Sequence, residues 1–375
     1  MNNFILHVIM QDFLFKKMRN TLFGLLIPLL FLACADAEKG KKEESTTAVD
    51  QQSETKITPM VEGKPERLVV VKDSLLKEIN QAIRKSLNQP ELYIRRASVY
   101  ERFGDASSAE EDLNRAYTID STNLSVLIAH SDYYLRRGEL SPSLAYLKQA
   151  RYYHPEAASV YLKMGELYLI GKDNRKSLQN ADLAIKYDMY NAQAYFLKGF
   201  NFLEMGDTTR AVSSFQTTVE QDPEHFEAYM QLGLLNSIKG DSIAIDYFEN
   251  ALEVEPKNKE AMYGIAMFQQ ENEMYNEALK TYHEILEYHP NFREAHYNLG
   301  YVHMYYLQLY RQASLHFSDA IEVDPNYYQA YYNRGYCFEL LGDVNNAIKD
   351  YQQSLAIEPS YDLAAKGISR VKDGV

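Results

Sequence analysis

The sequence predicts an all-α solenoid made of eight helix–turn–helix units. Small residues, alanines and prolines return in register about every 34 residues along the 375-residue chain. Each unit has two amphipathic stretches separated by a Gly-Asp type break, and a proline closes the second stretch. A unit of this size cannot bury its apolar face alone. Neighbouring units must therefore stack and share one continuous core.

Three columns of residues carry the repeat. The first holds glycine, with Lys172 in the one vacant place, the second holds alanine or serine, and the third holds proline. In that order the columns are Gly104, Gly138, Gly206 and Gly240; Ala109, Ser143, Ser177, Ala211, Ala244, Ala278, Ala313 and Ala347; Pro155, Pro223, Pro256, Pro290, Pro325 and Pro359.

These columns resemble the tetratricopeptide repeat, whose unit places an aromatic residue, Leu-Gly, Tyr, a small Ala, an aromatic residue and Pro in order. The last unit matches with Tyr331, Gly335, Phe338, Gly342, Ala347, Tyr351 and Pro359. The resemblance implies a right-handed α-solenoid with repeats at 90–123, 124–157, 158–191, 192–225, 226–258, 259–292, 293–327 and 328–361.

Two repeats differ in length from the others. The fifth is one residue short near Ser242, and the seventh is one residue long between Met304 and Arg311. We expect a loop to absorb each difference, because connecting segments tolerate insertions and deletions.

Helices are predicted to cap both ends of the repeat region 90–361, because terminal repeats need a polar outer face. The segment 73–89 has apolar residues at helical spacing and forms the predicted N-terminal cap. The segment 362–375 forms the C-terminal cap. Its apolar residues, expected to cover the last repeat, are Leu363, Ile368 and Val371.

The segment 1–33 is interpreted as a signal peptide. Its apolar run, 21–34, follows the basic residues Lys16 and Arg19. At about 14 residues the run is short for a transmembrane helix, which needs roughly 20, and it has the length of a signal-peptide core. Met18 offers a second start that would leave a signal of ordinary length.

Cys34 resembles the lipidated cysteine of bacterial lipoproteins. It follows the small Ala33 and directly precedes a polar segment, although Phe31 and Leu32 depart from the usual residues of that motif. Lipidation would make the chain membrane-anchored rather than membrane-spanning. In lipoproteins of this type, Ala35 after the cysteine goes with sorting to the outer membrane. The alternatives are an ordinary secretory signal or a signal anchor with a chance cysteine.

Residues 34–72 are predicted to form a flexible, lipid-anchored tether. They are rich in Lys, Glu, Ser, Thr and Gln and nearly free of aromatic residues, so they cannot bury enough surface to offset ordering. The whole chain has 52 acidic and 39 basic residues and a net charge of −13. This balance argues against a nucleic-acid partner, which requires a basic surface.

No catalytic or cofactor motif is found. A Walker loop, a dinucleotide glycine motif and a nucleophile elbow are all missing from the sequence. We therefore predict no enzymatic activity, no cofactor and no small-molecule substrate. Five histidines gather near the C-terminal end, and we interpret them as packing residues rather than metal ligands: His283, His289, His296, His303 and His316.

The first helix of each repeat lines the concave face in this family. Its fifth and ninth positions are four residues apart and project from one side of the helix. In the last five repeats these positions are bulky and apolar, and such tracts usually mark binding sites. They predict a partner-binding groove at Phe196, Phe200, Met230, Leu234, Tyr263, Met267, Tyr297, Tyr301, Tyr332 and Tyr336. The alternatives are packing between first helices or filling of the groove by the protein's own tether.

Two known family grooves are not reproduced. The chaperone-binding members clamp a terminal carboxylate with Lys and Asn, where this chain has aromatic and aliphatic residues. The sugar-transferase members carry an asparagine at the sixth position of successive repeats, where only Asn298 and Asn333 match.

The predicted function is that of a non-enzymatic scaffold or adaptor in the bacterial cell envelope. It would hold a partner peptide or helix in the groove, for assembly of an outer-membrane or secretion complex. The alternative is a regulator that docks a cell-wall hydrolase or another envelope enzyme. The lipid anchor would place the protein at the outer membrane.

Overall fold

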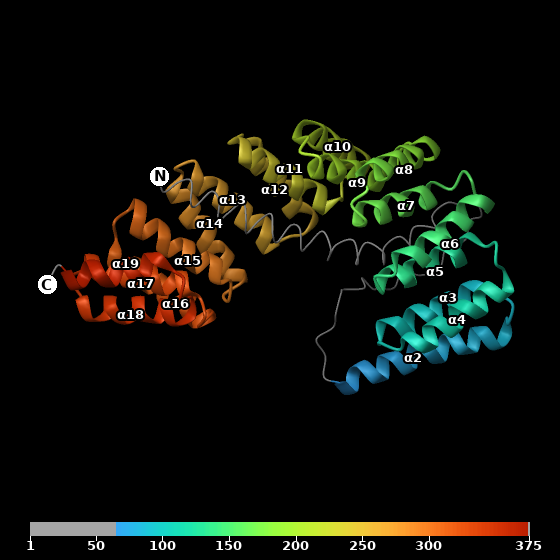
Figure 1. The fold of residues 1–375 in the computed structure, drawn as a ribbon, viewed down its shortest axis with the longest axis horizontal. Helices are drawn as coiled ribbons and strands as arrows, with labels where there is room; N and C mark the ends of the chain where they lie inside the picture. Colours follow the sequence, from blue (N-terminus) through green and yellow to red (C-terminus); the bar gives the residue numbers. More distant parts are fainter. Residues whose placement is uncertain (1–64, 374–375) are drawn as a thin grey trace, which may run out of the picture. The chain divides into compact units, whose positions relative to one another are not determined.

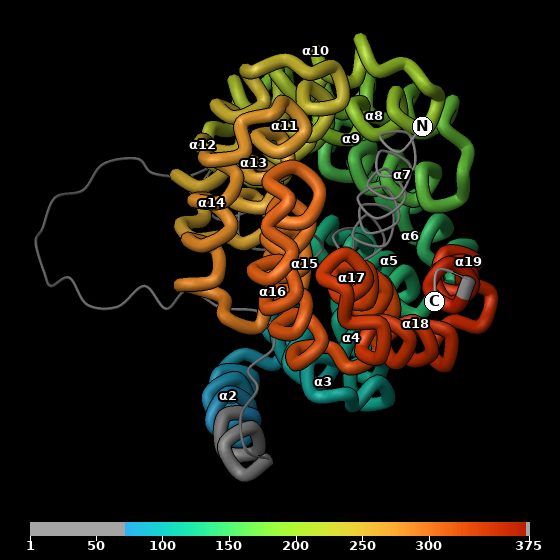
Figure 2. The backbone as a smooth tube through the Cα atoms, turned by 90° about the vertical axis from the view of Figure 1, so that its left-hand side faces the viewer, coloured from blue at the N-terminus to red at the C-terminus, as the bar shows by residue number. Residues whose placement is uncertain are grey.

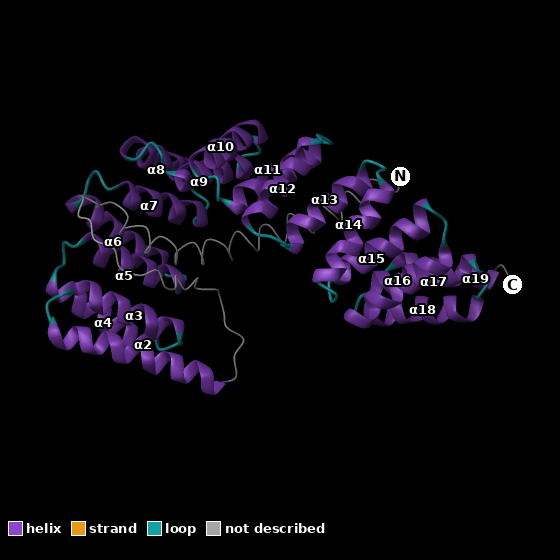
Figure 3. Cartoon of the chain, turned by 180° about the vertical axis from the view of Figure 1, so that it is seen from behind, coloured by secondary structure: helices purple, strands orange, loops and turns teal. Residues whose placement is uncertain are grey.

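The computed structural model describes residues 65–373, and this range is helical without a strand (Figure 3). The signal peptide, Cys34 and most of the predicted tether lie outside the described residues. The chain divides into two compact units whose boundary, Leu197/Lys198, falls inside helix α9 (Ala192–Glu204). Each unit is a series of helix hairpins (Figure 1).

The first unit contains the first three repeats and the helix in front of them. In chain order its helices are α2 (Pro65–Lys85), α3 (Pro90–Arg102), α4 (Ala106–Ile119), α5 (Leu124–Arg136), α6 (Leu140–Tyr153), α7 (Ala158–Ile170) and α8 (Asn174–Tyr187).

The second unit contains the remaining repeats, and in the tube of Figure 2 the helices α17 and α18 of the last hairpin lie side by side. Its helices after α9 are α10 (Thr208–Gln221), α11 (Phe226–Lys239), α12 (Ile243–Val254), α13 (Lys259–Glu271), α14 (Tyr275–Tyr288), α15 (Arg293–Tyr301), η2 (Val302–Tyr306), α16 (Tyr310–Val323), α17 (Tyr328–Leu340), α18 (Val344–Ile357) and α19 (Asp362–Asp373).

The Gly-Asp break between the two helices of a repeat has a simple geometry. Gly206 has a φ of 76°, a left-handed conformation that glycine adopts without a steric penalty. The next residue, Asp207, caps α10 by accepting a hydrogen bond from the Arg210 N–H at 2.9 Å. Lys172 occupies the glycine column with a φ of 59°, so the turn keeps its shape there against the preference of an L side chain.

Aromatic rings fill the space that the small residues leave between helices. Phe248 of α12 is fully buried. A Cβ atom built on either Gly233 of α11 or Gly264 of α13 would lie 2.6 Å from its ring. The two glycines therefore let one ring pack between the first helices of successive repeats. Where serine replaces alanine, the hydroxyl is satisfied, because Ser177 Oγ donates to the Gly165 carbonyl at 2.7 Å.

The length differences of two repeats are absorbed inside helices, so the expectation that loops absorb them is wrong. In the fifth repeat α12 has 12 residues, where α10 and α14 have 14, and α11 has 14 residues, where α13 has 13, so the two helices together are one residue short. In the seventh repeat the first helix continues as the π-helical turn η2, in which the Leu307 N–H donates to the Val302 carbonyl at 3.1 Å. A π-helical turn holds an extra residue without breaking the helix.

Helices also lie at both predicted cap positions, although their bounds and their buried residues differ in part from the prediction. The N-terminal helix α2 starts at Pro65 and ends at Lys85, where 73–89 was predicted. In the C-terminal helix α19, Val371 is buried and Ile368 packs beside it against the last repeat. Leu363 was expected to join them but is 43% exposed, and Ala364 takes the buried place.

None of the helices within residues 65–373 combines the length and apolar character that crossing a bilayer requires.

Candidate functional site

Within each unit the first helices of the repeats lie on the inner side of the stack. Helix α3 contacts α5 in the first unit, and α11 contacts α13 in the second. Successive second helices in the described chain make no comparable contact. At these two places neighbouring repeats approach each other through their first helices, which agrees with the lining of the concave face that the family resemblance implies.

The ten predicted groove residues fall into two classes of burial. Phe196, Phe200, Leu234 and Met267 are buried, and Phe200 packs edge-on against Phe215 with ring centroids 5.5 Å apart. These four side chains contribute mainly to the core. The other six are half-buried and keep part of their surface accessible: Met230, Tyr263, Tyr297, Tyr301, Tyr332 and Tyr336.

Two asparagines bind the hydroxyl groups of two of these tyrosines. Asn298 Nδ2 donates to Tyr263 Oη at 2.8 Å, and Asn333 Nδ2 donates to Tyr297 Oη at 2.8 Å. Each bond links the first helix of one repeat to the first helix of the repeat before it. The sequence singled out both asparagines as the only matches to another groove type, and the structure shows that they position tyrosines instead.

The tyrosine hydroxyls keep their protons near neutral pH. Burial is the main cause that raises the pKa of Tyr263, Tyr297 and Tyr301 well above the usual tyrosine value. Since Tyr263 and Tyr297 each accept a bond from an asparagine, each hydroxyl retains its own hydrogen as a donor. The hydroxyls of Tyr263 and Tyr297 thus occupy equivalent places in the sixth and seventh repeats, each fixed by an asparagine of the following repeat.

The π-helical turn extends the tyrosine surface. Tyr305, which is 43% exposed, stacks on Tyr301 with ring centroids 5.5 Å apart. Tyr306 stacks on Tyr275 of α14 at 4.2 Å, and burial is the main cause that raises its pKa to about 12. The extra residue of the seventh repeat therefore places consecutive aromatic side chains beside the predicted groove, which the sequence did not indicate.

In the first unit the equivalent positions alternate between apolar and polar residues, and Asp132 and Glu166 are the charged ones; Lys163 lies beside them, one position after Leu162. Lys163 Nζ lies 3.0 Å from Asp132 Oδ1, and both side chains are buried. The half-buried carboxyl group of Glu166 interacts electrostatically with both Lys163 and Asp132. Burial is the main cause that raises the pKa of Asp132 and of Glu166, while Lys163 acts in the opposite direction on both. Two carboxyl groups thus share one ammonium group on the inner side of this unit.

Several histidines hold the stack together, as the packing interpretation expects. His154 Nε2 lies 2.6 Å from the Thr122 carbonyl, and His289 Nε2 lies 2.7 Å from the Lys257 carbonyl. Both contacts join a repeat to the one before it. His296 stands in a column that other repeats fill with tyrosine, and its Nε2 contacts a carbonyl six residues earlier, as the Tyr161 hydroxyl does.

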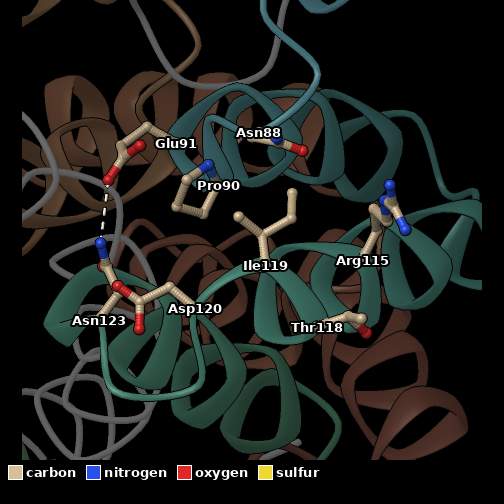
Figure 4. A pocket seen from close by; sticks show the side chains of 8 residues that line it. All are labelled: Asn88, Pro90, Glu91, Arg115, Thr118, Ile119, Asp120 and Asn123. Carbon is tan, nitrogen blue, oxygen red and sulfur yellow. Dashed lines mark hydrogen bonds between the residues drawn. The ribbon is translucent and has the colours of Figure 1, made fainter.

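Two other places hold side chains that could in principle take part in chemistry: a polar pocket and a cysteine. A polar pocket in the first unit holds Glu91, Asp120 and Arg115 in its wall, and Asn123 Nδ2 donates to Glu91 Oε1 at 3.1 Å (Figure 4). Asp120 accepts bonds from the backbone N–H and hydroxyl of Thr122. Cys337 is buried, and burial raises the pKa of its thiol to about 12, consistent with a packing role.

Family models described as tetratricopeptide repeat match residues 90–123, 196–241, 244–304 and 328–361. The first and last of these matches have the bounds of the predicted first and eighth repeats. No family of enzymes is among the matches. Among curated proteins, no sequence matches this chain.

A solved structure with a TM-score above 0.5 shows the same fold. The C-terminal part of a TPR repeat-containing protein from Cytophaga hutchinsonii aligns with 15% identity and a TM-score of 0.56, covering 64% of this chain and 98% of that one. A tetratricopeptide repeat protein from Parabacteroides merdae aligns with 17% identity and a TM-score of 0.46, covering 66% of this chain and 98% of that one. A chain of the APC/C hetero-tetramer Cut9–Hcn1 aligns with 17% identity and a TM-score of 0.45, covering 82% of this chain and 59% of that one.

Proposed function

We infer that this chain, which is a tetratricopeptide-repeat protein, uses its second unit to hold an extended segment of a partner protein. Repeats of this family form protein-binding scaffolds, so a scaffold role is the general conclusion. The observation that carries the finer proposal is the pair of oriented hydroxyls, Tyr263 held by Asn298 and Tyr297 held by Asn333.

The chemistry of these positions suits a peptide backbone. A tyrosine hydroxyl that accepts from an asparagine can donate to a carbonyl oxygen of a bound segment. The half-buried rings of Tyr301 and Tyr336 add apolar area on the same first-helix positions. Large, rigid aromatic side chains with a polar tip are typical of protein interfaces, because they bury much area at a low cost in conformational entropy.

Removing the two hydroxyl groups should weaken partner binding, and it should also lower folding stability somewhat, because the buried amides of Asn298 and Asn333 lose an acceptor. We expect the double variant Tyr263→Phe/Tyr297→Phe to lose at least tenfold in partner affinity, since each lost hydrogen bond contributes about 1 kcal/mol. The measurement is affinity capture from gently solubilised membranes with quantitative mass spectrometry, followed by titration of the captured partner.

The matched control is Tyr152→Phe, because Tyr152 is 80% exposed and belongs to the first unit. Equal capture by the wild type and the double variant, with unchanged affinity, would contradict binding at these hydroxyls. The identity of a protein lost only from the double variant separates the two predicted roles. A secretin or barrel protein would support assembly, and a cell-wall hydrolase would support regulation.

We also propose that the scaffold works at the bacterial envelope, attached by a lipid on Cys34. The support is the apolar run 21–34 that ends in Ala33-Cys34 and the polar segment that follows it. A tether of this composition would let the repeat region reach partners away from the membrane surface.

The change Cys34→Ser should move the protein from the membrane fraction to the soluble fraction. The reason is that a thioether-linked diacylglycerol would supply the anchoring energy. Fractionation followed by immunoblotting measures this, and Cys337→Ser is the matched control because that thiol is buried. Continued sedimentation of Cys34→Ser with membranes would favour a signal anchor.

A further inference from the structure

In the first unit, the loops that join one repeat to the next form a continuous edge. His154 Nε2, at the start of the loop between α6 and α7, lies 2.6 Å from the carbonyl of Thr122, in the loop between α4 and α5. Tyr161 on α7 joins the same α6–α7 loop to the end of α8. Its hydroxyl donates to the Pro155 carbonyl at 2.7 Å, and its ring stacks on that of Tyr187 with ring centroids 5.3 Å apart. We call this side of the first unit the loop edge.

Large apolar side chains are exposed along the loop edge. Tyr152 and Tyr153, at the end of α6, have ring centroids 5.1 Å apart, and both are exposed. Met189 and Tyr190, in the loop after α8, are 61% and 69% exposed. The Tyr195 hydroxyl donates to the Met189 carbonyl at 3.2 Å and so holds the backbone of this loop. Exposed apolar side chains that gather in one place usually mark an interaction surface.

Basic residues lie where the second helices of the first unit reach this edge. The last turn of α6 contains Arg151, and that of α8 contains Lys186, whose Nζ lies over the ring of Tyr187 at 5.2 Å from its centroid. The helix α2 ends in Arg84 and Lys85, while α4 is the exception without a basic residue. In the second unit the last turns of α10, α12, α14, α16 and α18 contain no basic residue.

The two units differ in overall charge in the same direction. Residues 65–197 carry 18 basic and 17 acidic side chains, whereas residues 198–373 carry 13 basic and 27 acidic ones. At the loop edge, Asp188 accepts hydrogen bonds from the Tyr190 backbone N–H at 3.3 Å and from Asn191 Nδ2 at 3.1 Å. An anionic surface would therefore repel the second unit and would be attracted by the cations at the loop edge of the first.

This combination of side chains fits the surface of a lipid bilayer. Tyrosine has an apolar ring with a polar tip, and it is enriched where the headgroups of a membrane meet the acyl chains. Lysine and arginine lay their aliphatic stems along apolar surroundings and extend their charges to lipid phosphates. The aromatic and methionine side chains would supply insertion, and the cations would supply attraction to anionic lipid.

We propose that the loop edge of the first unit docks on an anionic lipid surface. Tyr152, Met189 and Tyr190 would enter the headgroup region, and Arg151 and Lys186 would lie at the lipid phosphates. The inference rests on the proposed envelope location, but not on the hydroxyl pair of the second unit or on any partner protein. A few inserted side chains and cations bind weakly, so docking would orient the first unit while the lipid anchor still supplies the anchoring energy.

The test uses tryptophan as a reporter in the full chain. The chain contains no tryptophan, so Tyr152→Trp and Tyr190→Trp each introduce a single one. The probe is vesicles of phosphatidylethanolamine and phosphatidylglycerol, with and without brominated lipid, which quenches a tryptophan that enters the bilayer surface. We expect the emission of both variants to move to shorter wavelength and to lose intensity with brominated lipid. The matched control, Tyr288→Trp, should show neither effect, because Tyr288 is an exposed residue at the end of α14, whose last turn lacks a basic residue.

A second arm tests the cations. In the Tyr190→Trp background, Arg151→Gln/Lys186→Gln should raise the lipid concentration for half quenching at least about tenfold, since each basic residue near an anionic membrane adds to the attraction. Lys280→Gln, on α14 of the second unit, should leave that concentration unchanged. An unchanged concentration in the double charge variant would contradict docking on anionic lipid.

The outcomes also separate this proposal from the others. Quenching at neither first-unit position, or equal quenching of Tyr288→Trp, would overturn it. A shift of the Tyr190→Trp emission that requires added envelope proteins and does not occur with lipid alone would identify a protein-binding edge and overturn it as well. The fractionation of Cys34→Ser reports on the anchor, and the quenching reports on the loop edge, so either can fail without the other.

Discussion

Replacing Phe248 with alanine should lower the free energy of unfolding by about 3–5 kcal/mol, the usual effect of truncating a buried phenylalanine. The ring is fully buried and lies against Gly233 of its own repeat and Gly264 of the next. Neither glycine can fill the space that the ring would leave, so a cavity should open between successive repeats. Urea unfolding followed by circular dichroism measures the change.

The glycine on the far side of the ring gives a sharper test of this packing. Gly264→Ala alone should destabilise the protein, since its new Cβ would lie 2.6 Å from the ring of Phe248. In the Phe248→Ala background the same change should be nearly neutral or stabilising, because the methyl group would enter the cavity. Additive effects of the two changes would contradict this packing. Leu315→Ala, at a side chain that is 62% exposed, is the surface control.

Replacing Lys163 with methionine should lower the free energy of unfolding by about 3–5 kcal/mol at neutral pH, the usual effect of removing one member of a buried ion pair. Lys163 Nζ lies 3.0 Å from Asp132 Oδ1, and both side chains are buried. Without the ammonium group, the buried Asp132 carboxyl would have no counter-charge, so it would either bear the full cost of a buried charge or take up a proton. Chemical unfolding at several pH values measures the effect.

The pH dependence of this loss has a definite sign. Burial raises the pKa of Asp132 in the folded protein above its unfolded value, which is about 3.9. Stability from this group is therefore fully present below about pH 4 and is lost as the pH rises through the folded pKa. The penalty of Lys163→Met should be smallest in acid and largest near neutrality.

Removing both charges distinguishes the contribution of the ion pair to stability from the contribution of side-chain packing. Lys163→Met/Asp132→Asn should recover most of the stability at neutral pH, since replacing a buried pair by neutral groups is often tolerated. A double variant as unstable as Lys163→Met would show that the aliphatic stem of Lys163, rather than its charge, is the stabilising part.

The repeat register was predictable because it depends on local spacing. The Gly-Asp turns, the small residues and the aromatic columns fix two amphipathic helices per unit, and the described helices follow the predicted units from 90 to 361. Lys172 shows how strong that pattern is, since it adopts the left-handed φ of the glycine column. The bounds of α2 and the burial of Leu363 were less predictable, because terminal helices have packing neighbours on only one side.

The candidate site was predictable only in outline. Sequence position placed the groove residues on first helices, but they differ in burial, with Phe200 and Met267 in the core and Tyr297 half-buried. The bond from Asn333 to Tyr297 joins residues on different repeats. A pattern within one repeat carries no information about which atoms of two repeats meet.

The sequence by itself determined the all-α repeat architecture, the number of repeats and the absence of any recognisable catalytic motif, because each follows from spacing and residue type along the chain. Tertiary structure alone decided that the extra residue of the seventh repeat becomes the π-helical turn η2, and that the ring of His316 lies near those of His303 on this turn and of His283. The physical reason is that stacking brings together residues from neighbouring repeats. Their meeting depends on helix rotation and on one added residue, which the spacing within a single repeat does not specify.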